Sequence, residues 1–151
     1  MRTPPPPNTI TSLLLEVGRL YREDFRRRAA HLKLTQSQSM ALAWISKQPG
    51  ITQSALAEKL EVHPVTVTQL IDRLQRAGWV RRETHEDDRR ALRLYTTDKA
   101  DPILDELWSI AAEARAEALR GLSKSDQQQL DQLLSRIKSN LVGGSDADSR
   151  R

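Results

Sequence analysis

Hydrophobic and polar positions alternate with helical spacing along most of this chain, which predicts a mainly helical fold. From about Ile10, apolar residues recur every three or four positions with charged residues between them. Thr35 and Gln38 have the capping-box spacing of a second helix, which should end before Pro49-Gly50. The first stripe comprises Leu13, Leu14, Val17, Leu20, Tyr21 and Phe25.

The middle of the chain predicts a helix, a turn and a second helix. Thr52 can cap the first of these, and Pro64 follows His63 at the start of the second, since proline is tolerated at the first helical position. The second helix should run to Ala77 and end at Gly78. The inward positions are Leu56, Ala57 and Leu60 in the first helix, and Val67, Leu70, Ile71 and Leu74 in the second.

Two strands are predicted next, over residues 79–83 and 91–95, with a polar tip at 84–90 between them. Thr97 can cap a long helix that Gly121 closes, and Ser123 with Asp126 can cap the last helix. The apolar stripes of these helices are Ile103, Leu104, Leu107, Ala111, Ala114 and Ala118, then Leu130, Leu133, Leu134, Ile137 and Leu141.

These elements predict a fold that is mainly α with a small β-wing. It is a winged helix-turn-helix flanked by N- and C-terminal dimerisation helices, because pairing with a second copy would bury the terminal apolar stripes. The predicted divisions are a flexible Pro-rich arm at 1–9, one domain at 10–142 and a flexible tail at 143–151. Within the domain, 10–33 and 98–142 would be the dimerisation helices and 35–97 the winged helix-turn-helix.

Composition narrows the class of protein. The chain has 151 residues, 38% of them hydrophobic and 29% charged, which suits one folded domain. It has no cysteine, which excludes disulfides and thiolate metal sites, and we expect no cofactor. No apolar run approaches the ~20 residues that span a bilayer, so we expect a cytoplasmic protein without a membrane partner. The formal net charge of +4 permits a polyanionic partner.

The polar face of the helix at Pro64–Ala77 predicts double-stranded DNA as that partner. Short hydrogen-bonding side chains near its N-terminus can approach base edges, and Arg73 lies further along, toward the phosphates. The predicted major-groove residues are His63, Pro64, Val65, Thr66, Thr68, Gln69 and Arg73. The predicted phosphate contacts are Thr52, Gln53 and Arg76.

The ribbon that follows this helix is rich in both arginine and acidic residues, so its net charge is close to zero. Acidic residues at the tip can hold arginines in place and leave one to enter a minor groove. The arginines are Arg81, Arg82, Arg89, Arg90 and Arg93, and the acids are Glu83, Glu86, Asp87 and Asp88.

Three segments together resemble the MarR family of bacterial transcription regulators, and its SlyA-type members in particular. They are Leu34–Leu42, Thr52–Ala100 and Gly121–Leu134. Within them, Asp88-Arg89-Arg90 matches the wing motif D-x-R, and Tyr95–Ala100 follows the motif L-T-x-K-[GA] that closes it. Thr96 departs from the usual leucine. The resemblance extends from about Leu13 to Leu141.

The resemblance implies a homodimer that presents two winged helices to a pseudo-palindromic operator, with half-sites about 10 bp apart. By analogy, Asp88 would orient the wing, Arg89 or Arg90 would enter the minor groove, and Arg81 would join the wing contacts. Many members of the family are repressors released by a small aromatic anion. Such a ligand could meet Arg19, Arg22, His31 and Trp44, although solvated arginines and a core tryptophan explain these residues equally well.

Three other functions can be weighed against this one. The histidines His31, His63 and His85 are far apart in sequence, and no partner set for catalysis accompanies them. A metal-responsive regulator could use His85-Glu86-Asp87-Asp88, but adjacent loop residues cannot all face one ion. A winged helix used as a protein-interaction module should expose apolar anchors, whereas the outer face here is polar.

Overall fold

The computed structural model describes the backbone of residues 9–85 and 88–148, and the side chains of residues 9–84 and 91–142. The chain divides into two compact units, Met1–Ala114 and Arg115–Arg151. In order, the elements are α1 (Ile10–Arg28), η1 (Ala29–Leu32), α2 (Gln36–Lys47), β1 (Ile51–Thr52), α3 (Gln53–Leu60), α4 (Pro64–Arg76), β2 (Val80–His85), β3 (Asp88–Thr96), η2 (Asp98–Ala100), α5 (Asp101–Ala118) and α6 (Lys124–Asp148). No helix among the described residues is both long enough and apolar enough to cross a membrane.

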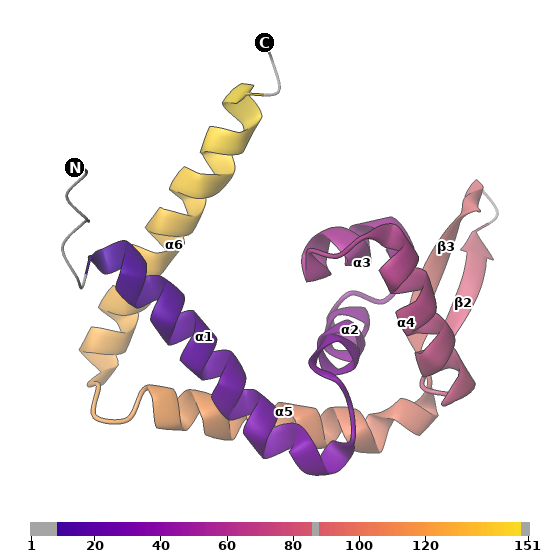
Figure 1. Ribbon diagram of the computed structural model, residues 1–151, viewed down its shortest axis with the longest axis horizontal. Helices are drawn as coiled ribbons and strands as arrows, with labels where there is room; N and C mark the ends of the chain where they lie inside the picture. The colour runs from indigo at the N-terminus through magenta and orange to yellow at the C-terminus, as the bar shows by residue number, and fades with distance from the viewer. Residues whose placement is uncertain (1–8, 86–87, 149–151) are drawn as a thin grey trace, which may run out of the picture. The chain divides into compact units, whose positions relative to one another are not determined.

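A single hydrophobic core holds α2, α3, α4, the sheet and the beginning of α5 together (Figure 1). The predicted inward face of α4 is confirmed, since its four apolar residues are all buried. Burying such side chains stabilises the fold by roughly 1.5–3 kcal/mol each. The largest fully buried side chains are Leu42, Ile45, Leu56, Ile71, Leu74, Leu94, Val67 and Val80.

The predicted helix caps explain where two helices of this unit begin. The Thr35 side chain accepts from the backbone N–H of Gln38, and the Gln38 side chain accepts from that of Thr35, which confirms the capping box. Thr52 caps α3 in the same way, through the N–H of Ala55 at 3.2 Å. Because the first N–H groups of a helix lack partners within it, these side chains fix the starts of α2 and α3.

The sheet is larger than the sequence predicted. The strands extend over Val80–His85 and Asp88–Thr96, so most of the predicted tip at 84–90 belongs to strands. A short strand that the sequence did not reveal, β1, adds to the outer edge of β3 through Ile51 and Leu94, giving the order β1-β3-β2. Two residues carry too little periodicity to be recognised as a strand, and pairing with a distant strand creates this one.

The start of α5 differs from the predicted one. The Thr97 hydroxyl donates to the carbonyl of Gly78 and makes no cap hydrogen bond, so the capping role was wrong. A short 3-10 turn, η2, comes first, and α5 begins at Asp101, next to Pro102. Gly78 follows the end of α4 with a φ of +80°, in the left-handed region that favours glycine. The buried residues of α5 are Leu104, Leu107, Ile110 and Ala114.

The second unit contains the C-terminal end of α5 and the helix α6. Ser123 and Asp126 form the predicted cap, with the Ser123 Oγ to Asp126 Oδ2 distance at 2.6 Å. This hydrogen bond lowers the pKa of the Asp126 carboxyl from its usual 3.8. Near the start of this unit, Arg120 pairs with Glu117 at 3.1 Å.

The predicted flexible tail at 143–151 was wrong for most of its length, because α6 continues through Gly143-Gly144 to Asp148. Adding a residue to an existing helix is cheap compared with nucleating one, and an interior glycine costs only about 1 kcal/mol relative to alanine. The remaining tail residues, 149–151, and residues 1–8 of the predicted Pro-rich arm lie outside the described chain.

Candidate nucleic-acid interface

The outer face of α4 combines exposure with a rigid support. His63 precedes the helix in an extended conformation, its Nδ1 accepts from the N–H of Val65 at 3.3 Å, and Pro64 occupies the first turn. Val65 is 58% exposed and is the large aliphatic side chain at the start of this face. Thr66, Gln69 and Arg73 are exposed beside it. Because the opposite face is buried in the core, these side chains project from a fixed helix.

The predicted contact residues separate into two groups by their internal hydrogen bonds. Within the described chain, Thr66, Gln69 and Arg73 have no side-chain hydrogen-bond partner. Thr68, in contrast, donates to the Pro64 carbonyl at 3.2 Å and accepts from Gln53 Nε2 at 3.2 Å. The first group therefore keeps its full hydrogen-bonding capacity for another molecule, and the second group is already engaged.

The three predicted phosphate contacts also have internal partners. Thr52 caps α3 and lies 3.2 Å from the Ser54 hydroxyl. Gln53 contacts Thr68, as described above. Arg76 Nε donates to the Asp72 carbonyl at 3.3 Å within α4, but the side chain remains exposed at the end of the helix. Of these three, Arg76 has the charge and the exposure that a phosphate contact needs.

Arg82 belongs to this surface, although the sequence pattern placed it only among the arginines of the ribbon and not among the predicted contacts. It points from β2 toward α4 and forms an ion pair with Asp72 at 2.7 Å. The strand alternation offered a signal, since residues two apart share a face and Val80 is buried. Arg82 also lies opposite the fully buried Leu94 in the β2–β3 pairing, which places it on the inner face of the wing. With Asp72, Gln75 and Arg76 it lines a shallow groove between the wing and α4.

The wing is described in its lower part. Arg81 forms an ion pair with Glu83, and its guanidinium lies 4.7 Å from the centre of the Tyr95 ring. Both acid and base are about half exposed, so the pair orients Arg81 without neutralising it fully. The predicted wing residues Asp88, Arg89 and Arg90 have their backbone at the start of β3, and their side chains lie outside the described part.

The four predicted effector residues have contacts that lead to different elements. Arg19 pairs with Glu23 at 3.4 Å along α1, and Arg22 is exposed on the same helix. His31 contacts Glu106 on α5, while Trp44 packs against the core with Lys59 Nζ 5.1 Å from its ring centre. The described contacts therefore do not join these residues into one pocket.

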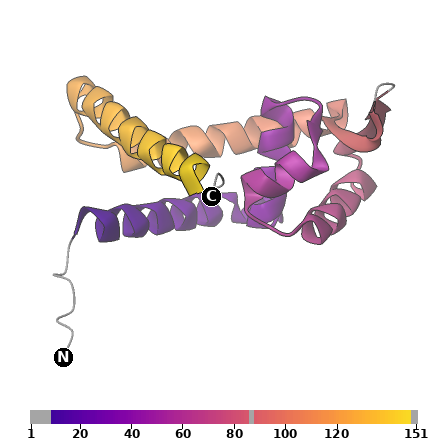
Figure 2. The same ribbon diagram turned by 90° about the horizontal axis from the view of Figure 1, so that it is seen from above.

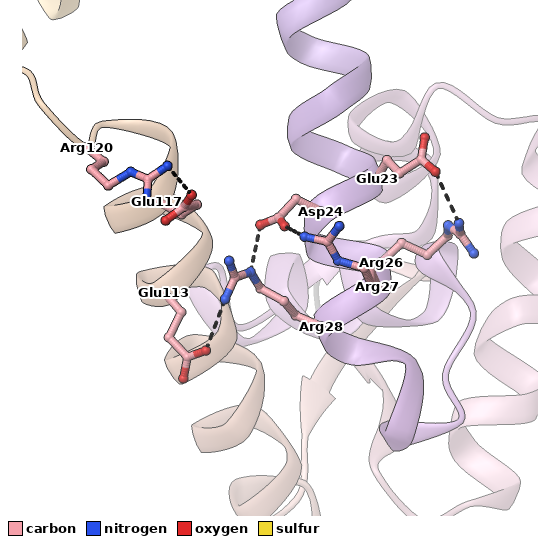
Figure 3. Close-up of polar contacts among 8 residues, drawn as sticks. All are labelled: Glu23, Asp24, Arg26, Arg27, Arg28, Glu113, Glu117 and Arg120. Atoms are coloured by element: carbon pink, nitrogen blue, oxygen red, sulfur yellow. Dashed lines mark hydrogen bonds and ion pairs between the residues drawn. The ribbon is translucent and has the colours of Figure 1, made fainter.

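Two polar links fasten the C-terminal end of α1 and η1 to α5 within the first unit. Figure 2 shows the helices α1 and α5 extending from the group formed by α2, α3 and α4. The Asp24 carboxylate forms ion pairs with Arg27 and Arg28, and Arg28 also forms an ion pair with Glu113 at 3.4 Å (Figure 3). The hydrogen bond from Arg28 lowers the pKa of the Asp24 carboxyl from its usual 3.8. The second link joins His31 to Glu106.

The His31–Glu106 link should make stability depend on pH. The hydrogen bond to Glu106 raises the pKa of His31 above its usual 6.5. A raised folded-state pKa contributes stability that is fully present below 6.5 and is lost as the pH rises through the raised value. We expect His31→Gln to lose stability relative to the parent at about pH 5.5 and much less at about pH 8.5. Thermal melts at both values measure this, and an equal loss at both would contradict it.

No cluster of three or more histidine, cysteine or acidic side chains suited to a metal ion occurs among the described residues. Glu86 and Asp87, two of the four residues considered for a metal-responsive regulator, lie outside them, and the side chains of His85 and Asp88 are likewise not described.

Comparisons with known proteins agree on one family. The family model described as MarR matches residues 34–92. The crystal structure of the transcriptional regulator PA3341 is 34% identical, with a TM-score of 0.81, over 89% of this chain and 99% of that one. The transcriptional regulator SlyA is 25% identical, with a TM-score of 0.77, over 89% of this chain and 94% of that one.

A third structure shares the fold alone. It is a MarR-family regulator from Listeria monocytogenes complexed with a 26mer DNA, with 20% identity and a TM-score of 0.80 over 91% of each chain. The predicted resemblance to the MarR family and the predicted winged helix-turn-helix are thus confirmed, and the match to SlyA supports the predicted likeness to SlyA-type members. The family match over the α2–β3 region, together with 34% identity across nearly the whole of a transcriptional regulator, shows that this chain belongs to the MarR family.

Proposed function

We propose that this chain is a homodimeric repressor that binds a pseudo-palindromic DNA operator in a sequence-specific way. Proteins of the MarR family are DNA-binding regulators of transcription and not enzymes. The observation that carries the proposal for this chain is the face of α4. Thr66, Gln69 and Arg73 are exposed and unpaired within the described chain, on a helix whose other side is fixed in the core.

The unpaired side chains of α4 are suited to the major groove. Gln69 can bond the N6 and N7 edge of an adenine with both ends of its amide. The Val65 and Thr66 methyl groups can contact a thymine methyl. His63 and Pro64 begin the helix and sit where its N-terminus would approach the groove. Arg73 and Arg76, three residues apart and exposed further along α4, are suited to contacts with DNA phosphates.

The wing would supply the second contact. In our proposal, Asp88 orients the tip of the β2–β3 hairpin and Arg89 or Arg90 enters the minor groove. Arg81 would contact the backbone, since Glu83 and Tyr95 hold its guanidinium in one direction. A narrow minor groove has an enhanced negative potential, which favours an inserted arginine.

A second copy of the chain would cover two apolar surfaces. On α1, Leu13, Val17 and Leu20 are 58%, 53% and 50% exposed. On α6, Leu133, Leu134 and Leu141, which share one face, are 51%, 40% and 71% exposed. Monomers rarely leave such continuous stripes in water, and a two-fold dimer is the simplest way to bury them. Two winged helices held by one dimer would then address two half-sites about 10 bp apart.

Release from the operator by a small aromatic anion belongs to the same proposal. Arg19 and Arg22 are exposed cations on α1, and His31 and Trp44 offer a titrating ring and an aromatic surface. These residues do not share a contact in one described chain, so a ligand would bridge them only after dimerisation or a local rearrangement. A cytoplasmic location follows from a chromosomal operator.

The protein-interaction alternative is less well supported. A module that docks on another protein usually presents several residues that become buried at the interface, such as aromatic side chains. The outer face of α4 offers Val65 as its one large aliphatic side chain, beside Pro64 and among polar and charged neighbours. DNA binding is therefore the better explanation of this surface.

We expect Gln69→Ala to change sequence preference and Arg90→Ala to weaken binding. Loss of a bidentate base contact costs about 1–3 kcal/mol at the base it reads, and loss of a wing arginine lowers affinity with little change in preference. The operator is first recovered by selection of the parent protein on a random-sequence duplex pool. Fluorescence titrations of each variant then compare that duplex with versions substituted at single base pairs.

Salt dependence provides the control for this experiment. Parent binding should fall steeply between about 50 and 200 mM salt, because phosphate contacts release counterions. Arg90→Ala should have a shallower slope, whereas Gln69→Ala should keep the parent slope. If both variants bind the selected duplex and its substituted versions as the parent does, the assigned face is wrong.

A further inference from the structure

We propose that Arg82 is a positioning residue, which fixes the reading face of α4 against α3 and the wing and does not itself contact a base. The inference rests on the proposed DNA-binding function and adds to it. It assigns specificity to a side chain behind the contact surface. It also assigns Gln53 and Thr68 to that support, in place of the direct DNA contacts that the sequence suggested.

The Arg82 guanidinium joins three elements of the winged helix. Its Nε donates to Gln53 Oε1 on α3 at 2.8 Å, and its Nη1 donates to Gln75 Oε1 on α4 at 2.8 Å. Its Nη2 donates to the Thr68 carbonyl on α4 at 3.3 Å and lies 2.7 Å from Asp72 Oδ1. A planar guanidinium with donors in a fixed fork can satisfy partners in several directions at once.

Burial and charge separate Arg82 from the arginines that face solvent. Its side chain is only 18% exposed, and the Asp72 carboxylate, 44% exposed, compensates its charge. A cation that is paired and largely covered offers little to a phosphate, whereas Arg73 and Arg76 are exposed. Removing one partner from such a network leaves the other polar groups without compensation, so the network resists rearrangement.

The network reaches the first turn of α4 through Gln53 and Thr68. Gln53 accepts from Arg82 with Oε1 and donates with Nε2 to Thr68 Oγ1, at 3.2 Å. The Thr68 hydroxyl in turn donates to the Pro64 carbonyl at 3.2 Å. Pro64 immediately precedes Val65 and Thr66, which the proposed function places at the bases. Arg82 is therefore linked by three consecutive hydrogen bonds to the turn that reads the DNA.

The test compares Arg82→Lys with Arg76→Lys. Both changes keep the positive charge, but only the first removes a fork that holds several partners. For each protein, titrations give the affinity for the duplex selected by the parent and for a scrambled duplex of the same composition. We expect Arg82→Lys to lower the ratio of selected to scrambled affinity by about tenfold, because at least one charge-assisted hydrogen bond is lost. Arg76→Lys should leave that ratio within about twofold of the parent.

Coupling to the reading residue distinguishes positioning from general support. If Arg82 acts through the placement of α4, combining Arg82→Lys with Gln69→Ala should cost less specificity than the two single losses added together. Purely additive losses, or a parent-like ratio for Arg82→Lys, would overturn the proposal. If the parent selects no duplex at all, the proposed function fails as well, so the two failures are distinguishable.

A neutral variant keeps the test decisive should Arg82→Lys fail to fold. Gln75→Met removes the acceptor of Arg82 Nη1 without changing charge, and Gln75 is exposed on α4 outside the proposed contact set. We expect its specificity ratio to fall by about threefold, with the melting temperature and the scrambled-duplex affinity close to the parent's. A ratio equal to the parent's in this folded variant would overturn the positioning role.

Discussion

Leu134→Glu should convert the protein from a dimer to a monomer and lower its affinity for a two-half-site operator by about 10²- to 10⁴-fold. Leu134 is 40% exposed on α6, among other exposed apolar side chains of that helix. In the proposed dimer this stripe is buried, and an unpaired carboxylate there would lose its hydration. Each released monomer could hold only one half-site, so the gain from linked binding would disappear.

Gln132→Glu is the matched control for this change. It introduces the same charge two residues away, on the opposite side of α6, since two residues are separated by about 200° around a helix. Light scattering should give the 17.1 kDa monomer for Leu134→Glu. The parent and Gln132→Glu should both give twice that mass. A dimeric Leu134→Glu protein with unchanged operator affinity would show that α6 is not part of the dimer interface.

Ile71→Ala should lower the free energy of unfolding by about 2–5 kcal/mol. Ile71 is fully buried on α4, in the cluster that also contains Leu42, Leu56 and Leu94. Truncating it removes apolar burial and leaves a cavity that the surrounding helices and sheet can fill only in part. The loss is a large fraction of the stability of an ordinary domain, so DNA binding should decline at growth temperature as the protein unfolds.

Val65→Ala, on the same helix, separates stability from recognition. Val65 is 58% exposed, so its truncation should change unfolding by no more than about 0.5 kcal/mol. It should nevertheless weaken discrimination at the base pair that Val65 contacts. Urea unfolding followed by circular dichroism, at one fixed protein concentration because a dimer's stability depends on concentration, measures both variants. Equal destabilisation of the two would contradict the amphipathic assignment of α4.

The sequence predicted those local features that depend only on residues close together in the chain. The caps at Thr35 and Thr52 and the buried face of α4 followed from spacing alone, because helical geometry repeats every 3.6 residues. The role of Thr97 was misjudged by the same reasoning. Its hydroxyl donates to the carbonyl of Gly78, nineteen positions earlier, and a rule based on neighbouring residues cannot predict that hydrogen bond.

On the proposed DNA-contact surface, too, the sequence predicted what depends on one helix but not what depends on a neighbouring element. The sequence identified the outward residues Thr66, Gln69 and Arg73 by their angle around the helix, and the structure places them outward. It could not separate them from Thr68, because that hydroxyl is engaged by Gln53 from another helix. Angular position predicts exposure, but availability for DNA depends on neighbours that only folding brings near.

The sequence by itself determined the family, the order of the helices and the polar face that would read DNA, since these depend on motifs and on periodicity within single elements. Only the tertiary structure decided that Arg82 lies between β2, α3 and α4, that β1 joins the sheet, and that Gln53 and Thr68 are engaged. Hydrogen bonds between residues 29 positions apart, such as that of Arg82 with Gln53, leave no periodic trace in the chain. They exist because packing the core brings their elements together.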